Sequence, residues 1–158
     1  DPGGLFIVRP ITLPDGAEHP DTGVWLVRFR FSRCGETFIY NAVMIAQRGQ
    51  LPLAQKFLPG ETSADPVLFR DMKMQLEAIS IIGASKAGKP CDNVATPKIE
   101  NTTAPVVQEN VALPDGRRLQ RVNEEIWTMR TCGVAVPVKV RFFIDPARPG
   151  VSFSMPLN

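Results

Sequence analysis

The residues best suited to chemistry in this chain are three cysteines and a single histidine. A catalytic cysteine needs a base beside it, and none of Cys34, Cys91 and Cys132 has a candidate base close in the sequence. No two of them form a Cys-x-x-Cys pair, and His19 adds too few ligands for a zinc site. The sequence therefore predicts no catalytic residue, no metal site and no cofactor.

Cysteines can instead be joined in a disulfide bond, as is common in exported proteins. We favour a bond between Cys91 and Cys132, which would tie the segment after a predicted helix to a predicted hairpin and contribute about 3 to 4 kcal/mol through loop closure. Cys34 would then be a free and buried thiol. Two alternatives are a bond between Cys34 and Cys132, and three buried thiols in a reducing compartment.

A histidine can act as a general base. His19 lies in a segment rich in turn residues, and no serine or cysteine motif is visible for it to activate, so an exposed loop histidine is favoured. The alternative is a small envelope hydrolase or transferase with its site near His19 and a loop predicted over residues 48–64. The adjacent carboxylates of Glu124 and Glu125 would point to opposite faces of a strand and could not form an acid–base pair.

Residues 83–89 match the beginning of a phosphate-binding P-loop, Gly-x-x-x-x-Gly-Lys. The motif is incomplete, because Pro90 stands where a magnesium-binding Ser or Thr is required. Its context is reversed as well, since a P-loop follows a strand and begins a helix, whereas here a helix is predicted before it. We expect no nucleotide site.

The basic residues do not predict nucleic-acid binding. Arg28 and Arg30 share one predicted strand face, and Lys139 and Arg141 share another, but neither face has exposed aromatic side chains between its charges for stacking bases. The formal net charge is only +2, which is far from the strongly basic balance of nucleic-acid binders.

A repeated pattern indicates the elements that position these residues. The two copies are Leu13-Pro14-Asp15-Gly16, Trp25 and Cys34-Gly35, and Leu113-Pro114-Asp115-Gly116, Trp127 and Cys132-Gly133. Pro-Asp-Gly favours a turn, because proline presets φ and glycine accepts a positive φ. Each copy leads into a run of alternating apolar residues that ends at Cys-Gly. The chain therefore resembles two β-hairpin units around a middle segment.

Period-two alternation defines the predicted strands. In residues 24–32 one face carries Trp25, Val27, Phe29 and Phe31, and the other carries Arg28, Arg30 and Ser32. Residues 37–46 are apolar on both faces and should lie in the middle of a sheet. The second hairpin covers 122–131 and 136–145, and its inward face carries Val136, Val138, Val140, Phe142 and Ile144. Shorter strands are predicted at 5–8, 106–112 and 151–155.

One main helix is predicted over about residues 65–82, because Asp65 and Pro66 suit its first positions, apolar residues follow at helical spacing, and Gly83 offers a stop. The overall prediction is an α+β fold, with an antiparallel sheet of about six strands packed against this helix in a single domain over 1–158. The chain is 44% hydrophobic and 22% charged, as is usual for a globular protein. No run approaches the ~18 apolar residues of a membrane span.

The last hundred or so residues resemble small uncharacterised proteobacterial envelope proteins and lipoproteins. The matching features are Leu58-Pro59-Gly60-Glu61-Thr62, Asp65-Pro66, Arg70-Asp71, Cys91, Trp127-Thr128-Met129-Arg130-Thr131-Cys132-Gly133 and Val138-Lys139-Val140-Arg141-Phe142. The resemblance implies an exported protein with an oxidised pair of Cys91 and Cys132, and it carries over no activity. This chain departs from the pattern at residues 145–150, where a Gly-Gly turn is expected.

We therefore expect a non-enzymatic protein of the periplasm or cell surface of a Gram-negative bacterium that binds a protein or an envelope component. The first residues lack an initiator Met and suit a processed N-terminus, which a signal peptide or a lipid-anchored cysteine would precede. An unpaired sheet edge could accept a partner strand or a second copy of the chain. A third interpretation is carriage of a small apolar ligand beside Met72 and Leu76.

Overall fold

The computed structural model describes residues 2–89, 91, 96–112, 116–146 and 150–156. Its contacts group the chain into two compact units: Asp1–Gly60 with Ala64–Pro66, and Glu61–Ser63 with Val67–Asn158. We call these unit 1 and unit 2 and describe each by itself. A single domain over residues 1–158 stays a prediction.

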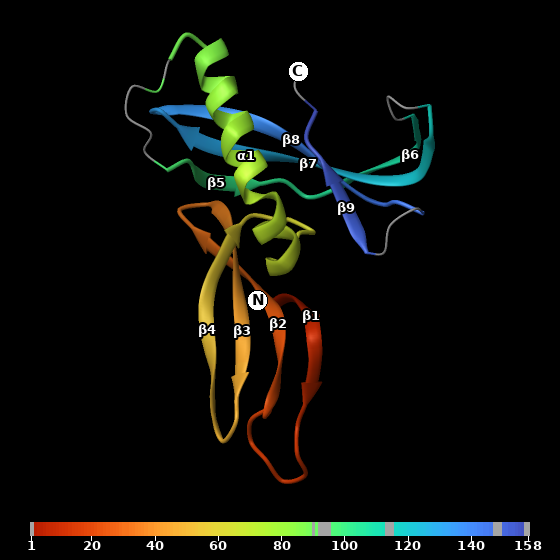
Figure 1. Ribbon diagram of the computed structural model, residues 1–158. Coiled ribbons are helices and arrows are strands. Elements are labelled where there is room, and N and C mark those ends of the chain that lie inside the picture. Colours follow the sequence, from red (N-terminus) through yellow and green to blue (C-terminus); the bar gives the residue numbers. More distant parts are fainter. Residues whose placement is uncertain (1, 90, 92–95, 113–115, 147–149, 157–158) are drawn as a thin grey trace. The chain divides into compact units, whose positions relative to one another are not determined.

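Unit 1 is built from one four-stranded antiparallel sheet, sheet A, in the order β1-β2-β3-β4 (Figure 1). Its strands are β1 (Pro2–Thr12), β2 (Thr22–Arg33), β3 (Glu36–Gln47) and β4 (Gln50–Pro59). The predicted strands at 24–32 and 37–46 are confirmed, and β3 lies in the interior of the sheet as its two apolar faces indicated.

The loop predicted over residues 48–64 is wrong for most of its length, because Gln50–Pro59 forms β4. Pro52 and Pro59 suggested a loop, since proline cannot donate a ladder hydrogen bond. At an edge of a sheet, however, proline is tolerated, because every second amide points away from the neighbouring strand. β4 is an edge strand of sheet A, so its prolines are compatible with the strand.

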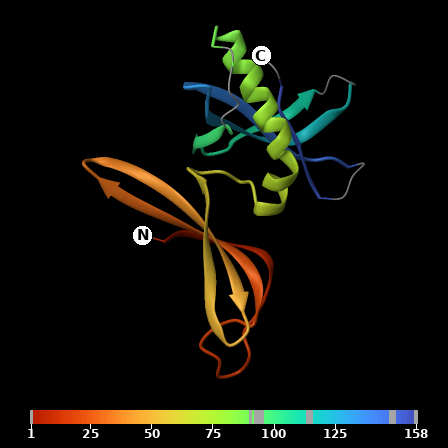
Figure 2. The same ribbon diagram turned by 60° about the vertical axis from the view of Figure 1, so that its left-hand side comes forward.

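Unit 2 combines a five-stranded antiparallel sheet, sheet B, with the helix α1 (Pro66–Lys86). The strands are β5 (Lys98–Thr102), β6 (Val106–Ala112), β7 (Arg118–Thr131), β8 (Val134–Ile144) and β9 (Val151–Ser154). β5 and β6 both pair with β7, which is followed by β8 and β9. Figures 1 and 2 show α1 lying across the strands of this sheet. The α+β class is confirmed, but the strands form two sheets and not one sheet of about six.

The helix begins at Pro66 as predicted but continues past Gly83 to Lys86. The residue that caps the end of the helix is Gly88, which has a φ of 73°. The N–H of Gly88 donates to the carbonyl of Ser85 at 3.0 Å, and that of the next residue donates to the carbonyl of Ala84 at 3.1 Å. This pair of bonds is the Schellman arrangement that satisfies the last carbonyls of a helix.

Gly83 has a packing role inside the helix. A Cβ atom placed on it would lie 2.5 Å from Cγ1 of Val136 in β8, so the missing side chain lets α1 approach the sheet closely. The contacting face of the helix is confirmed by its buried residues Met72, Leu76, Ser80 and Ala84. The opposing sheet residues Trp127, Met129, Val136 and Val138 are buried as well. Ile144, predicted to face inward, is 73% exposed, because it ends β8 beyond the buried Phe142.

The two Cys-Gly steps form matching turns. Cys34 and Gly35 have φ values of 52° and 80°, and Cys132 and Gly133 have values of 51° and 80°. Two successive residues with positive φ are the signature of a two-residue type I′ hairpin. The repeated pattern therefore gives two equivalent hairpins, β2–β3 and β7–β8. The first Pro-Asp-Gly turn is also formed, with the N–H of Ala17 donating to the carbonyl of Pro14 at 3.0 Å.

Two predicted turns fall on parts of the chain that the structure does not describe. Leu113–Asp115, in the second Leu-Pro-Asp-Gly copy, lie outside the described residues, as do residues 147–149 in the segment that departs from the envelope-protein pattern. The strands on either side of them are described: β6 has the bounds predicted for it, and β9 ends one residue before the predicted strand.

Candidate functional site

A disulfide bond joins Cys91 to Cys132, with 5.4 Å between their Cα atoms. This confirms the favoured pairing and rules out the bond between Cys34 and Cys132. The bond links the segment after α1 to the β7–β8 turn. Cys34 is free, but the prediction that it is buried is wrong, because its side chain is exposed. A residue in a two-residue hairpin turn has neighbours on few sides, which explains this exposure.

The predicted enzymatic alternative centred on His19. This residue is half-buried in the loop between β1 and β2. An ion pair of 3.2 Å between Arg48 Nε and Asp21 Oδ2 joins the same loop to the turn between β3 and β4, at the beginning of the 48–64 segment. Within the described part of the chain, no group of three or more His, Cys, Asp or Glu side chains could hold a metal ion.

Glu125 and Glu124 point to opposite faces of β7, as predicted. Glu125 is fully buried. One of its carboxylate oxygens accepts hydrogen bonds from the main-chain N–H of Ser63 at 2.7 Å and from its hydroxyl at 2.6 Å. The other accepts a bond of 2.8 Å from Trp127 Nε1. With both oxygens engaged, the carboxylate anchors the segment before α1 to sheet B.

Glu124 is held between two cations on the opposite face of β7. Its carboxylate accepts a hydrogen bond from Arg141 Nε at 2.8 Å and lies 3.3 Å from Lys139 Nζ. Burial raises the pKa of Glu124, but the hydrogen bonds and charges of Arg141 and Lys139 outweigh it, and the net pKa lies below the ordinary value. The basic face predicted at Lys139 and Arg141 is therefore partly neutralised by an acidic neighbour.

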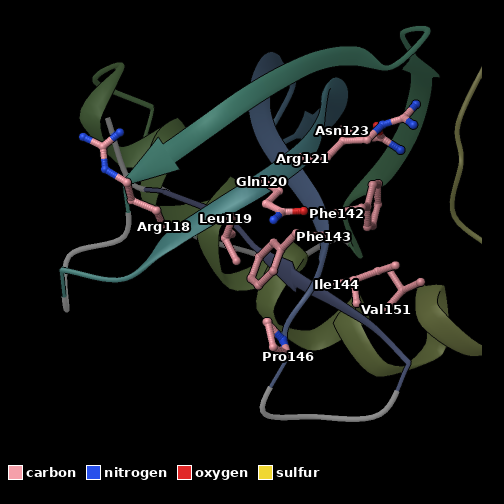
Figure 3. Close-up of a pocket in the computed structure, with 10 residues that line it drawn as sticks. All are labelled: Arg118, Leu119, Gln120, Arg121, Asn123, Phe142, Phe143, Ile144, Pro146 and Val151. Carbon is pink, nitrogen blue, oxygen red and sulfur yellow. The ribbon is translucent and has the colours of Figure 1, made fainter.

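A cavity of about 620 Å³ lies along β7 and β8 in unit 2 (Figure 3). Its lining includes apolar side chains and two arginines, Arg118 and Arg121. Figure 3 shows these arginines toward opposite ends of the cavity, with guanidinium groups directed away from one another. They are not arranged to clamp one anionic group together.

A smaller cavity of about 230 Å³ lies between α1 and β8, beside Ile79, Gly83 and Val136. It bears on the predicted carriage of an apolar ligand next to Met72 and Leu76. Neither of these residues lines this cavity or the larger one. Both are instead buried in the packing between helix and sheet.

The most unusual surface belongs to unit 1. Phe29 pairs directly with Tyr40, and Phe31 with Phe38, so all four side chains share one face of the β2–β3 hairpin. β1 adds Leu5 and Ile7 to the same face, where they pair across the strands with Val27 and Trp25. We call this surface face A1. The large side chains that it exposes are Leu5 (60%), Ile7 (63%), Phe29 (37%), Phe31 (54%), Phe38 (39%) and Tyr40 (43%).

The aromatic side chains of face A1 contact one another. The ring centroids of Phe29 and Phe31 lie 6.3 Å apart, and those of Phe31 and Tyr40 lie 5.9 Å apart with their planes steeply inclined. Lys56 in β4 places its Nζ atom 5.9 Å from the centre of the Tyr40 ring. Face A1 therefore presents an aromatic cluster with Lys56 on one side and the Arg33–Glu36 pair next to the turn. Such clusters combine a large apolar area with few rotatable bonds.

The opposite face of sheet A holds the strands in register. Buried Asn41 donates from Nδ2 to the carbonyls of Leu58 at 2.6 Å and Gly60 at 2.9 Å, and its Oδ1 accepts from Arg28 Nε at 3.0 Å. The Arg28 guanidinium also lies 5.4 Å from the ring centre of Phe6. These contacts fix the end of β4 on β3 and occupy Arg28, which was predicted to belong to a basic face.

Sequence reasoning placed Phe29 and Phe31 on one strand face, but it found neither their neighbours on face A1 nor the exposure of that face. The alternation of Phe29 and Phe31 with Arg28 and Arg30 is the pattern of a strand with one buried face, and it is the same whether or not another layer covers that face. One feature of the sequence did indicate an exposed face: it predicts two hairpin units but only one main helix to cover them.

No family model, curated protein or solved structure matches this chain. The resemblance to proteobacterial envelope proteins therefore stays a prediction. Within the residues described, no helix is both long enough and apolar enough to span a membrane.

Proposed function

We propose that this protein is a non-enzymatic, exported binding protein of the bacterial envelope, and that face A1 is the surface through which it binds a partner protein. The observation that carries this proposal is the exposure of six large apolar side chains on one face of sheet A. Together they expose on the order of 500 Å² of apolar surface. Patches of this size lie at the upper end of the range for monomers and are often functional.

The composition of face A1 supports a protein partner. Aromatic side chains are enriched at the centres of protein interfaces, where they provide most of the binding free energy. Phe29, Phe31, Phe38 and Tyr40 are contiguous, and Lys56 lies beside them. A sheet normally buries at least one face against another layer, so a partner on face A1 would supply that layer.

The face is a better candidate than the edges of sheet A. The edge strand β4 contains Pro52 and Pro59, and the pairing of β1 with β2 is irregular around Gly4 and Arg9. Prolines and irregular pairing are features by which proteins limit strand addition at an exposed edge. We therefore place the proposed interface on the face of the sheet and not along its edge.

The disulfide between Cys91 and Cys132 supports the proposed export. Disulfides form and persist in oxidising compartments such as the bacterial periplasm and the cell surface, and they are rare in the cytoplasm. The bond is compatible with a protein that acts outside the cytoplasm.

Site-specific photo-crosslinking tests the proposed function. A photoreactive phenylalanine analogue is placed at Phe31 on face A1 or, as a matched control, at Ser32, which is also exposed but points to the opposite face. After illumination of cells that produce the protein naturally, we expect a discrete protein adduct from position 31 and none from position 32. Equal labelling from both positions, or none from either, would contradict the proposal.

A further inference from the structure

The two hairpins of the chain are equivalent position by position. Both have a two-residue Cys-Gly turn, and both continue as regular antiparallel ladders without a register shift. Counted from the turn, the third and fifth residue pairs lie on the same face of each hairpin. These pairs are Phe31–Phe38 and Phe29–Tyr40 in β2–β3, and Met129–Val136 and Trp127–Val138 in β7–β8.

In unit 2 this face of the hairpin is covered by α1. The ring of Phe69 lies 6.2 Å from that of Trp127, and Gly83 lies directly against Val136. All four hairpin residues on this face are at most 7% exposed. Their counterparts on face A1 are between 37% and 54% exposed. Unit 2 thus supplies a helix for the apolar face of its hairpin, whereas residues 2–60 of unit 1 contain only strands and loops.

We propose that the occupant of face A1 is an amphipathic α-helix of a partner protein, lying on the β2–β3 hairpin as α1 lies on β7–β8. The proposal rests on the proposed function and names the kind of partner. Docking of an amphipathic helix on an apolar surface is a recurrent mode of protein recognition. Here the chain itself contains an example of a helix that fits this type of hairpin face.

The contacts of α1 indicate what such a helix should look like. Its buried residues Met72, Leu76, Ser80 and Ala84 recur at every fourth position, with large side chains in the first half and small ones in the second. Gly83 is the point of closest approach to the third pair of its hairpin. In face A1 the third pair is Phe31–Phe38, which is bulkier, so a small residue of the partner helix is expected above it.

Charge gives the expected orientation of polar residues on the partner. Among the described residues, three charged ones share face A1 with the aromatic cluster: Lys56 lies beside Tyr40, and Arg33 and Glu36, which pair next to the turn, balance one another. A partner helix should therefore carry Asp or Glu along the flank that passes Lys56. Such a rim charge affects orientation and association rate more than affinity.

Two synthetic peptides of 21 residues, the length of α1, test the inference. The first has Leu and Ala at every third or fourth position and Glu along one flank, and the second has the same composition in an order that destroys the stripe. Fluorescence anisotropy of labelled peptide measures binding, and circular dichroism measures helix formation. We expect the first peptide to bind the intact protein with micromolar affinity and to become helical, and the second not to bind.

Variants of the protein localise the binding. Phe31→Ala should weaken binding of the first peptide about tenfold, whereas Ser32→Ala on the other face should change it by less than about twofold. Lys56→Glu, an exposed substitution that leaves the aromatic cluster intact, should weaken it about threefold and should bind a Lys-flanked peptide better. Thermal unfolding of each variant shows whether it is folded.

Each other outcome would overturn the inference in a recognisable way. Equal binding of both peptides would show that face A1 binds apolar peptides nonspecifically. Binding that is unaffected by Phe31→Ala would place the binding site elsewhere. Sedimentation showing a dimer that Phe31→Ala dissociates, without peptide binding, would make a second copy the occupant and leave face A1 a protein interface. A monomer that binds neither peptide would exclude an amphipathic helix as the occupant of face A1. The crosslinking at Phe31 would then test the proposed function separately.

Discussion

Ser63 donates two hydrogen bonds to the same carboxylate oxygen of Glu125, one from its main-chain N–H and one from its hydroxyl. Ser63 lies just before α1, and Glu125 lies fully buried in β7. The pair therefore fastens the beginning of the helix segment to sheet B. A buried carboxylate is stable only when hydrogen bonds replace its lost hydration, so this contact and the bond from Trp127 are required together.

Glu125→Gln should reduce the free energy of unfolding by about 2 to 3 kcal/mol, because a neutral amide cannot accept at both positions and leaves buried donors unsatisfied. Ser63→Ala should cost about 1 to 2 kcal/mol, since it removes only the hydroxyl and keeps the main-chain bond. Urea unfolding measures both. Glu109→Gln, at an exposed position of β6, is the control, and a Glu125→Gln protein as stable as this control would show that the anchor is unimportant.

The effect of Gly83→Ala on the free energy of unfolding should have opposite signs with Val and with Ala at position 136. In the native protein the new Cβ atom would meet Val136 at 2.5 Å, and the overpacking cost of about 1 to 3 kcal/mol should exceed the gain of about 1 kcal/mol in helix propensity. In a Val136→Ala background the clash is absent, so the same substitution should stabilise. Chemical unfolding of the four proteins of this cycle gives both values. Stabilisation in both backgrounds would mean that the close approach has no energetic weight.

The thiols should react in two groups. Cys34 is exposed and free, whereas Cys91 and Cys132 are joined, so a thiol reagent should modify one cysteine in the native protein and three after reduction and unfolding.

The disulfide should also stabilise the fold. Cys91 and Cys132 lie 41 positions apart in the sequence, and closing a loop of this length predicts a stabilisation of about 4 kcal/mol. Cys91→Ser with Cys132→Ser should lower stability accordingly, and Cys34→Ser should leave it within about 0.5 kcal/mol. Three reactive thiols before reduction would contradict the bond and weaken the case for export.

Acid should weaken the contacts of Glu124 with Arg141 and Lys139. Folding lowers the pKa of Glu124 from 4.5, so its contribution is complete above this value and is lost as the pH falls through the folded pKa. The contribution should be about 1 kcal/mol, since the cations are partly exposed. The free energy of unfolding should be measured from about pH 6 to about pH 2. It should decrease less over this range in Glu124→Gln than in the native protein.

The local elements of this protein could be predicted from residues that are neighbours in the chain. The Cys34-Gly35 and Cys132-Gly133 steps predicted two hairpins, because a turn with positive φ at two successive residues depends only on residues near it. Asp65 and Pro66 likewise predicted where the helix begins. The pairing of Cys91 with Cys132 was favoured from where these elements lie along the chain, and the α+β class followed from them.

What each element packs against could not be predicted in this way and is seen only in the folded chain. Phe29 and Trp127 occupy equivalent positions of similar hairpins, and both look like core residues in the sequence, yet one is exposed and the other is covered by α1. Alternation records which residues share a face, but burial depends on whether another layer lies over that face, and this layer comes from elsewhere in the chain. For the same reason Pro52 suggested a loop: whether a proline interrupts a strand depends on whether that strand has a neighbour on both sides.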